Sequence, residues 1–322
     1  MSALIRPLSI FLFLLSVFLF CGCHPKSTTI EPHFTYLPRQ KDFESLPKAF
    51  SELSQQELER EWGKELKIGI AFARELDLYR AITAFKRSLV LMPPDCLDRQ
   101  LQTSFYLVQS YYLGGKHDEA IAAFASGPLP MVCSSTFPAF RELMIILYDA
   151  YRQTDQKEKA QLALTIIESG DSGTARDLAL YSAIDEANFS DISTLASFHP
   201  LGDEAAEFLN QYTIHAKSVS TARTLNALIP GAGYYYVGQK TTALTSFTIN
   251  TAFIAAAYYF FKSGNWGAGL ITTSLEFGWY FGGINGAGLA AKEYNTCLYR
   301  EYGKILLQKN KLFPVLMFNV SF

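Results

Sequence analysis

The first candidate for chemistry is the glycine-rich stretch LIPGAGYYYVGQ, residues 228–239. Closely spaced glycines can cradle a phosphate, because backbone N–H groups reach the anion where no side chain intervenes. A dinucleotide-binding loop needs a third glycine in G-x-G-x-x-G, and Tyr236 occupies that position. A P-loop needs Gly-Lys-Ser/Thr, and here Gln239 separates Gly238 from Lys240. Neither nucleotide-binding pattern is therefore present.

The remaining reactive side chains form no catalytic or metal-binding pattern. No G-x-S-x-G occurs, and no C-x-x-C or Cys/His spacing suggests a metal. The histidines are scattered: His24, His33, His117, His199 and His215. We predict no enzyme activity, no metal and no cofactor, with an enzyme of unrecognised type as the alternative. A net charge of −2 gives no basis for nucleic-acid binding.

Two apolar runs of membrane-spanning length follow the glycine-rich stretch. Thr241–Phe261 carries no charge, and about twenty apolar residues are enough to cross a bilayer. After KSGN at 262–265, the run Trp266–Ala291 carries a single charge, Glu276. Both runs are predicted to be transmembrane helices, about 241–261 and 266–291, of one hairpin.

Small residues recur at helical spacing in both runs. Gly278, Gly282 and Gly286 lie four residues apart, and Ala252 and Ala256 give the first run a matching strip. Such stripes let helices approach closely within a bilayer. We expect these residues to form the helix contact of the hairpin, and the hairpin could also join copies in a homo-oligomer.

Glu276 is the one ionisable residue within the runs. An intramembrane carboxylate is a candidate for ion passage or partner docking. The alternative is a protonated glutamate that hydrogen-bonds a hairpin neighbour such as Asn250 or Thr251. The absence of a second ionisable group in either run favours this alternative.

The glycine-rich stretch resembles the P-G-x-G-x-x-Y-x-G entry motif of small bacterial two-helix membrane hairpin proteins. The matching residues are Pro230, Gly231, Gly233, Tyr236 and Gly238. The later GAGLAAKEYN, 286–295, resembles the small-residue exit of the same hairpins. The resemblance covers Thr224 to Asn295 and implies membrane residence without a known chemistry.

The chain begins with a segment typical of export. One basic residue, Arg6, precedes an uncharged core from Pro7 to Phe20 that is short for a membrane span. The ending Phe20-Cys21-Gly22-Cys23 resembles the bacterial lipoprotein cleavage box, which implies lipidation of Cys23. Phe20 departs from the family, which usually has leucine there. The alternative is an uncleaved membrane anchor, and in both cases the chain leaves the cytoplasm.

The charges around the hairpin conflict with this topology. Export puts both hairpin ends outside and KSGN inside, whereas basic residues are expected on the cytoplasmic side. The basic residues at the ends are Arg223, Lys240, Lys292, Arg300 and Lys304, against Lys262 in the loop. We give the signal sequence precedence, because an exported domain fixes the orientation of the helices after it. A hairpin that lies in the interface is a further alternative.

Three copies of one pattern lie between Trp62 and Glu168. Each has an apolar face on a first helix, a turn, and a second helix in which a large apolar residue follows a small one by four positions. The small residues, Ala81, Ala120 and Ala160, are 39 and 40 residues apart. A small residue there lets two antiparallel helices approach closely.

This pattern resembles the tetratricopeptide repeat. The first copy matches at Gly69, Phe72, Ala81, Phe85 and Pro93; Tyr111, Ala120 and Phe124 of the second copy and Tyr151 and Ala160 of the third hold equivalent places. The family period is 34, so each linker here carries five or six extra residues. Val108 and Tyr148 stand where the family has glycine, and the third copy lacks the closing proline. The resemblance implies a stack with a concave surface that holds a peptide or protein, or that serves only as a spacer.

Two further features leave alternatives open. Cys96 and Cys133 fall in comparable linkers, where they could form a disulfide or remain thiols. The final KLFPVLMFNVSF alternates apolar residues and resembles the terminal strand of outer-membrane barrels. After a helical hairpin we expect a short strand or an interfacial tail instead.

The sequence therefore predicts an all-α protein, with a tetratricopeptide-like helical-hairpin solenoid followed by a transmembrane helical hairpin. Its predicted parts are a signal peptide (1–22), a tether (23–56), the repeats (57–222), the hairpin (223–295) and a C-terminal tail (296–322), and residues 174–218 are expected to form a degenerate fourth repeat and a cap. We expect a membrane-anchored scaffold of the bacterial envelope whose repeat groove binds another envelope protein or peptide. The alternative is a small transport or pore component that uses the hairpin and Glu276.

Overall fold

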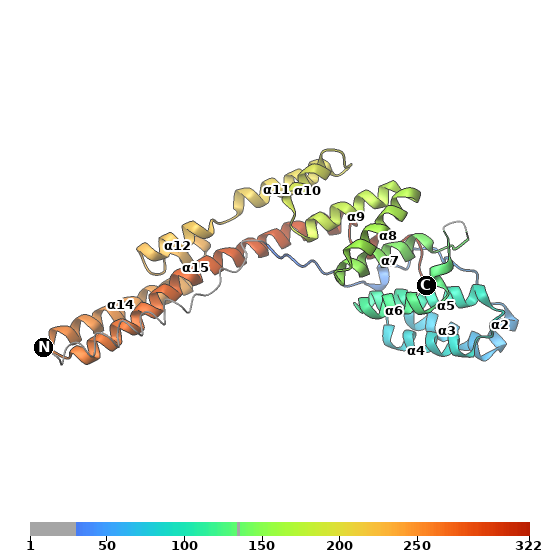
Figure 1. The fold of residues 1–322 in the computed structure, drawn as a ribbon, viewed down its shortest axis with the longest axis horizontal. Coiled ribbons are helices and arrows are strands. Elements are labelled where there is room, and N and C mark those ends of the chain that lie inside the picture. Colours follow the sequence, from blue (N-terminus) through green and yellow to red (C-terminus); the bar gives the residue numbers. More distant parts are fainter. Residues whose placement is uncertain (1–29, 134–135) are drawn as a thin grey trace. The chain divides into compact units, whose positions relative to one another are not determined.

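The computed structural model describes residues 30–133 and 136–322, and every regular element of this part of the chain is a helix (Figure 1). The prediction of an all-α protein is confirmed. The predicted signal peptide and Cys23 lie outside the described residues. The chain forms two compact units: a large unit, Pro32–Ala216 with Asn295–Phe322, and a small unit that includes Lys217–Tyr294.

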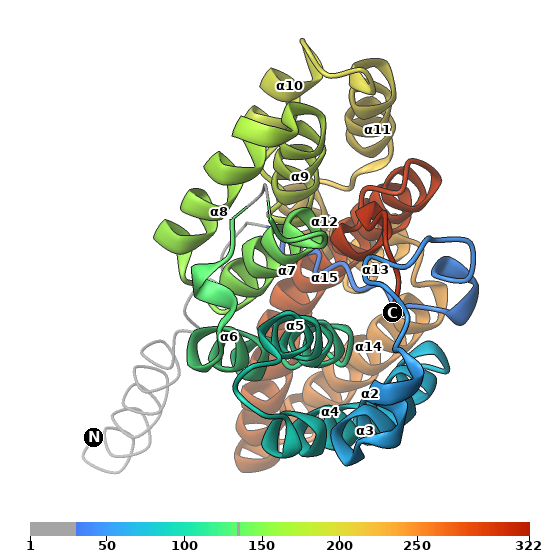
Figure 2. The ribbon, with the colours of Figure 1, turned by 90° about the vertical axis from the view of Figure 1, so that its right-hand side faces the viewer.

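The large unit is a succession of helix pairs. The pairs are α3 (Glu61–Arg74) with α4 (Leu78–Leu91), α5 (Leu97–Leu113) with α6 (His117–Ser126), and α7 (Phe140–Gln153) with α8 (Lys157–Gly170). The short helix α2 (Gln55–Glu59) precedes them, and α9 (Ser172–Asp185), α10 (Phe189–Ala196) and α11 (Gly202–His215) follow. In Figure 2 these elements are stacked in chain order, from α3 and α4 to α10 and α11.

The turns inside the pairs share one backbone feature. Leu76, Gly115 and Asp155 have left-handed φ values of 59°, 69° and 57°, and Ala187 between α9 and α10 has 51°. A single left-handed residue ends one helix and lets the chain reverse into the next. Asp77 then starts α4, because its carboxylate accepts a hydrogen bond from the backbone N–H of Arg80.

Small side chains bring the helices of each pair together. Ala81, Ala120 and Ala160 are buried, with at most 4% of their surface exposed. Gly69 lies against the buried ring of Phe85, and a Cβ added there would come within 2.6 Å of that ring. The close approach of α3 and α4 therefore depends on the absence of a side chain at residue 69.

The small unit contains α12 (Val219–Leu228), α13 (Ala232–Val237), α14 (Lys240–Lys262) and the first part of α15 (Trp266–Lys309). The second hairpin helix was expected to end at Ala291, and this boundary is wrong because α15 continues to Lys309. The apolar run does end there, but no proline follows to end the helix. The change of composition therefore marks a change in what surrounds α15, and the helix itself continues.

The last turns of α15 belong to the large unit. Tyr299 is fully buried, and its hydroxyl donates to the backbone oxygen of Ile184 at 2.9 Å. The predicted tail 296–322 is therefore wrong for its first half, which is helical and packed.

The glycine-rich stretch forms α13 between two left-handed glycines. Gly231 precedes α13 with φ 91° and Gly238 follows it with φ 94°, values that side chains rarely tolerate. A Cβ at Gly233 would collide with the backbone oxygen of Ala222 and lie 2.8 Å from the Cβ of Ala287. The glycines thus fold α12 and α13 closely onto α15.

We predict that Gly233→Ala lowers the free energy of unfolding of the small unit by roughly 1–3 kcal/mol, because the added methyl group has no space. Gly278→Ala is the control, since nothing lies within 4 Å of a Cβ at that position. The control should be neutral or stabilise by up to about 1 kcal/mol. Denaturant unfolding in detergent, followed by the fluorescence of Trp266 and Trp279, measures both. Equal transitions for the two variants would contradict the close packing at residue 233.

Candidate functional site

The candidate site is a groove on the inner side of the first three helix pairs. We define the groove by Arg74 of α3, Tyr106 and Tyr112 of α5, and Arg141 and Glu142 of α7. It is occupied by the same chain, which runs from α15 through Leu312 and the 3-10 helix η3 (Pro314–Met317) into an irregular stretch, Phe318–Phe322, that bends at Asn319. We call Phe318–Phe322 the groove segment.

The chain is anchored just before the groove. Leu312 and Phe313 are 1% and 2% exposed. The ring centroid of Phe313 lies 5.1 Å from that of Tyr36 and 6.0 Å from that of Tyr181. This aromatic contact fixes where the chain enters the groove and is separate from the contacts of the groove segment.

Two aromatic side chains of the groove segment are buried against tyrosines of α5. Phe318 lies 6.2 Å from Tyr112, and Phe322 lies 5.4 Å from Tyr106, between ring centroids. Their exposed fractions are 3% and 2%. Burial of a phenylalanine side chain contributes about 1.5–3 kcal/mol, so these two rings supply a large share of the attraction.

The groove also binds the backbone of the segment. Arg141 donates from Nη1 to the backbone oxygen of Met317 at 2.7 Å, and the N–H of Asn319 donates to Glu142 Oε1 at 3.0 Å. Arg74 donates from Nε and Nη2 to the backbone oxygen of Phe322 at 3.2 and 3.0 Å. These contacts are made to backbone atoms, so they carry little dependence on side-chain identity.

The charges of the groove are held by a network that includes α9. Glu142 is 2% exposed and pairs with Arg141 at 3.3 Å. Arg141 also pairs with Asp171 at 2.9 Å, and Asp171 accepts hydrogen bonds from the backbone N–H and hydroxyl of Thr174. The bonds from Thr174, and then the Arg141 guanidinium, hold the pKa of Asp171 at about 2. Asp171 therefore stays ionised and keeps Arg141 aimed at the segment.

An N-terminal strap, residues 32–54, covers the groove from another side. Pro47 and Leu46 accept hydrogen bonds from the backbone N–H and the hydroxyl of Ser321, at 2.9 and 3.1 Å. Phe50 contacts Phe105 and Tyr106 of α5, with ring centroids 6.0 and 5.5 Å apart. The prediction of a tether at 23–56 is wrong for the strap, because Phe50 packs on α5 and Phe34 and Phe43 are buried.

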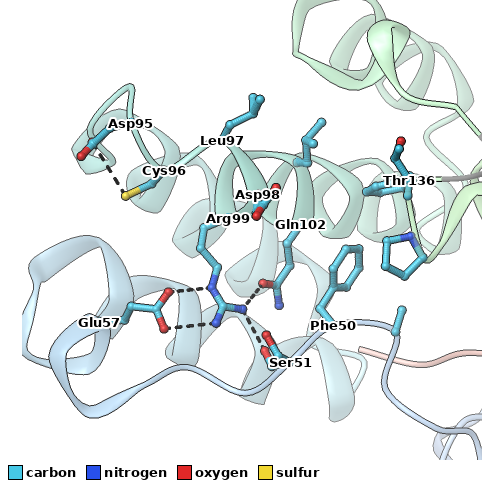
Figure 3. Close-up of a pocket in the computed structure, with 14 residues that line it drawn as sticks. Phe50, Ser51, Glu57, Asp95, Cys96, Leu97, Asp98, Arg99, Gln102 and Thr136 are labelled. Atoms are coloured by element: carbon cyan, nitrogen blue, oxygen red, sulfur yellow. Dashed lines mark hydrogen bonds and ion pairs between the residues drawn. The ribbon is translucent and has the colours of Figure 1, made fainter.

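Arg99 fastens the strap at the edge of a pocket of about 600 Å³ (Figure 3). It makes two bonds to the Glu57 carboxylate, at 2.8 and 3.1 Å, and further bonds to Gln102 and to the backbone oxygen of Ser51. These bonds hold the pKa of Glu57 at about 2. Cys96 lines the same pocket and, like Cys133, is a thiol, so the linkers are not joined by a disulfide.

A second buried polar cluster ties α5 to α7 and α9. The hydroxyl of Tyr112 donates to Asp149 Oδ2 at 2.7 Å, and Arg152 lies 3.6 Å from Asp149 and 3.1 Å from Asp185. Burial raises the pKa of Asp149, against the opposing effects of Tyr112 and Arg152. The cluster is a cross-link between helix pairs that places Tyr112 under Phe318.

The residues singled out as the repeat signature lie within and between the helix pairs, away from the groove. Phe72, Tyr111 and Tyr151, which hold equivalent places, each have a cation over the ring, from Arg80, Lys86 and Lys159 at 5.4, 5.4 and 5.5 Å. Phe124 and Pro93 are half-buried. The groove residues were not singled out, because an arginine and a glutamate on an amphipathic helix are typical of a solvated face. The alternating apolar residues at 316–322 were the available signal.

The predicted glycine stripe does not form the contact of the hairpin. A Cβ at Gly278 or Gly282 would meet open space, whereas Gly286 lies against the hydroxyl of Tyr234. Gly283, outside the stripe, lies between α12 and α14, since its Cβ would lie 3.2 Å from Nδ2 of Asn226 and 3.9 Å from the hydroxyl of Ser246. A four-residue repeat drifts around a helix of 3.6 residues per turn, so the stripe does not follow one straight neighbour.

Glu276 has no hydrogen-bond partner for its two buried carboxylate oxygens. The neighbours expected to bind it use their side chains on backbone oxygens of α14: Asn250 donates to Ser246 at 2.6 Å and Thr251 to Phe247 at 2.8 Å. Of the helices in the described residues, α14 alone has the length and apolar composition of a membrane span.

Comparison of the chain with protein-family models, with curated proteins and with solved structures gave no match.

We predict that Glu57→Gln lowers the free energy of unfolding by about 1–2 kcal/mol at pH 7, the range for a partly exposed hydrogen-bonded ion pair. The pKa of Glu57 is about 2 in the folded chain and 4.5 in the unfolded one, so its stabilisation is present above pH 4.5 and lost as the pH falls toward 2. Urea unfolding at pH 7, 4 and 3 should show the two proteins converging. Glu61→Gln, at a pair with Lys64 that is mostly exposed, is the control and should differ little at any pH. A gap for Glu57→Gln that does not change with pH would contradict the assignment.

Proposed function

We propose that this chain is an exported, membrane-anchored scaffold that holds a partner of the bacterial envelope by a segment of the partner's chain. The helix pairs, which resemble tetratricopeptide repeats in sequence, would form the binding domain. The hairpin of α14 and α15, together with a lipid on Cys23, would hold that domain at a membrane. No catalytic role is proposed.

The observation that carries the proposal is the set of contacts by which the groove binds the groove segment. It buries two aromatic side chains four residues apart and binds backbone atoms of Met317, Asn319 and Phe322 through Arg141, Glu142 and Arg74. A surface that recognises a chain segment in this way is suited to a peptide of another protein, because most of the polar contacts are to backbone atoms.

The membrane part of the proposal is supported by exposed apolar side chains of the small unit. On α14, Leu244 and Ile254 are 68% and 56% exposed, and on α15, Ile271 and Leu275 are 64% and 59% exposed. Contiguous apolar surface of this kind is unfavourable in water and favourable in a bilayer. Arg223 and Asn285 hydrogen-bond each other within the unit at 3.3 Å, which reduces the cost of placing them near lipid.

Site-specific photo-crosslinking in living cells tests the scaffold. We expect a photoreactive residue at Ala71, which is exposed and lines a pocket beside Phe322, to crosslink a discrete partner. The same residue at Tyr79, 82% exposed on α4, is the control and should not. Identical products from both positions, or none from Ala71 and other groove-edge positions, would remove the groove as the partner site.

Cysteine labelling tests the hairpin. With both ends outside the cytoplasm, a membrane-impermeant maleimide applied to intact cells should label the exposed Cys297 and should not label Ser263→Cys in the loop. Inverted vesicles should reverse the pattern for the loop. Labelling of Ser263→Cys in intact cells, with Cys297 also labelled, would show that the hairpin does not span the membrane.

A further inference from the structure

The groove cannot be left empty without disturbing its charges. Glu142 is only 2% exposed, and one of its two bonds comes from the backbone N–H of Asn319. Arg141 likewise loses its acceptor if Met317, which directly precedes the segment, moves with it. A buried charge that loses a hydrogen-bond partner is strongly disfavoured. The vacated groove is therefore a minor state, and a replacement segment restores the lost bonds.

The groove segment can leave without the rest of the chain. The preceding anchor, Leu312 and Phe313, is buried on Tyr36 and Tyr181 and makes no use of the groove. The end of α15 is held separately, since Lys309 and Asn310 both bind Glu204, at 3.1 and 2.8 Å. Displacement of Phe318–Phe322 thus costs only its own contacts, which an incoming segment of the same pattern replaces.

We propose that Phe318–Phe322 is a displaceable occupant of the groove, and that the partner docks by a segment with aromatic residues four positions apart. The residue before the first aromatic side chain presents its backbone oxygen to Arg141. The residue after it presents its N–H to Glu142, and the second aromatic residue presents its backbone oxygen to Arg74. This inference rests on the proposed scaffold function and names the chemistry of its partner and the regulation of its site.

If one segment replaces another, the internal segment must compete with any segment that is added in trans. The apparent affinity for a segment added in trans falls with the fraction of molecules whose groove is vacated, so weakening the internal segment must raise it. The probe is a fluorescent peptide of residues 311–322, KLFPVLMFNVSF, and the control peptide has alanine at both phenylalanine positions of the groove segment.

The test uses the full chain in detergent. We expect Phe322→Ala to bind the probe at least tenfold more tightly than the unchanged protein, and to bind the control peptide no more tightly. Phe208→Ala removes an equally buried ring away from the groove and should leave the affinity unchanged. Adding Arg141→Met to Phe322→Ala should abolish the gain. Equal affinity of Phe322→Ala and the unchanged protein, or equal binding of the two peptides, would overturn the proposal.

Hydrogen exchange provides a second measurement that needs no variant. The backbone N–H of Asn319 and Ser321 should exchange through a local opening faster than those of α5 and α7. If these two groups exchange only with global unfolding, the segment is not displaced locally and the proposal is overturned.

Two other outcomes concern the occupant. If the protein forms concentration-dependent dimers that Phe322→Ala abolishes, the occupant is a second copy of the chain and not a partner protein. If a partner crosslinks at Ala71 but the probe peptide does not bind, the proposed scaffold function is supported and only the inference about the groove segment is wrong.

Discussion

The large unit depends on pairing the polar side chains that its helices α5 and α7 bury, and most of the pairs that form lie within and between these helices. Gln102, Thr103, Ser104, Gln109 and Ser110 are all buried on α5, and Glu142 and Asp149 are buried on α7. Polar groups removed from water need hydrogen-bond partners. The groove segment supplies one of these partners, because the backbone N–H of Asn319 donates to Glu142. In return Arg74 donates to the backbone oxygen of Phe322, so the end of the chain is held against helices that are distant in sequence.

The sequence predicted the parts of the fold that depend on residues close together in the chain. The period of the alanines located the first three helix pairs, because a small residue facing a large one leaves a regular signal in the chain. It could not locate the groove segment, since Phe318 and Phe322 pack on Tyr112 and Tyr106, which lie about two hundred residues away in the chain. It also misjudged the strap, because proline-punctuated polar segments look alike whether they are solvated or pinned by a few aromatic residues.

In the small unit the glycine-rich motif was assigned to membrane entry on resemblance, and the structure adds a steric account of its residues. Gly231 and Gly238 provide left-handed termini for α13, and the hydroxyl of Tyr236 accepts a hydrogen bond from the backbone N–H of Ser218 at 3.1 Å. Asn226, 1% exposed, accepts the N–H of Gly231 at 2.9 Å. The motif is thus a compact corner in which four of the five matched residues, Gly231, Gly233, Tyr236 and Gly238, have a conformational, packing or bonding reason. The glycine stripe of α15 was expected to pack inside the hairpin, and two of its members face outward instead.

The length of the linkers between helix pairs has its own consequence. A stack with the 34-residue period of tetratricopeptide repeats has little chain to spare between pairs, whereas here the linkers after α4 and α6 are longer. Asp95 and Cys96 from the first linker and Thr136–Pro138 from the second line the pocket in Figure 3, together with the start of α5 and residues of the strap. The cavity is therefore lined jointly by two linkers, α5 and the strap, and no single helix pair contains it.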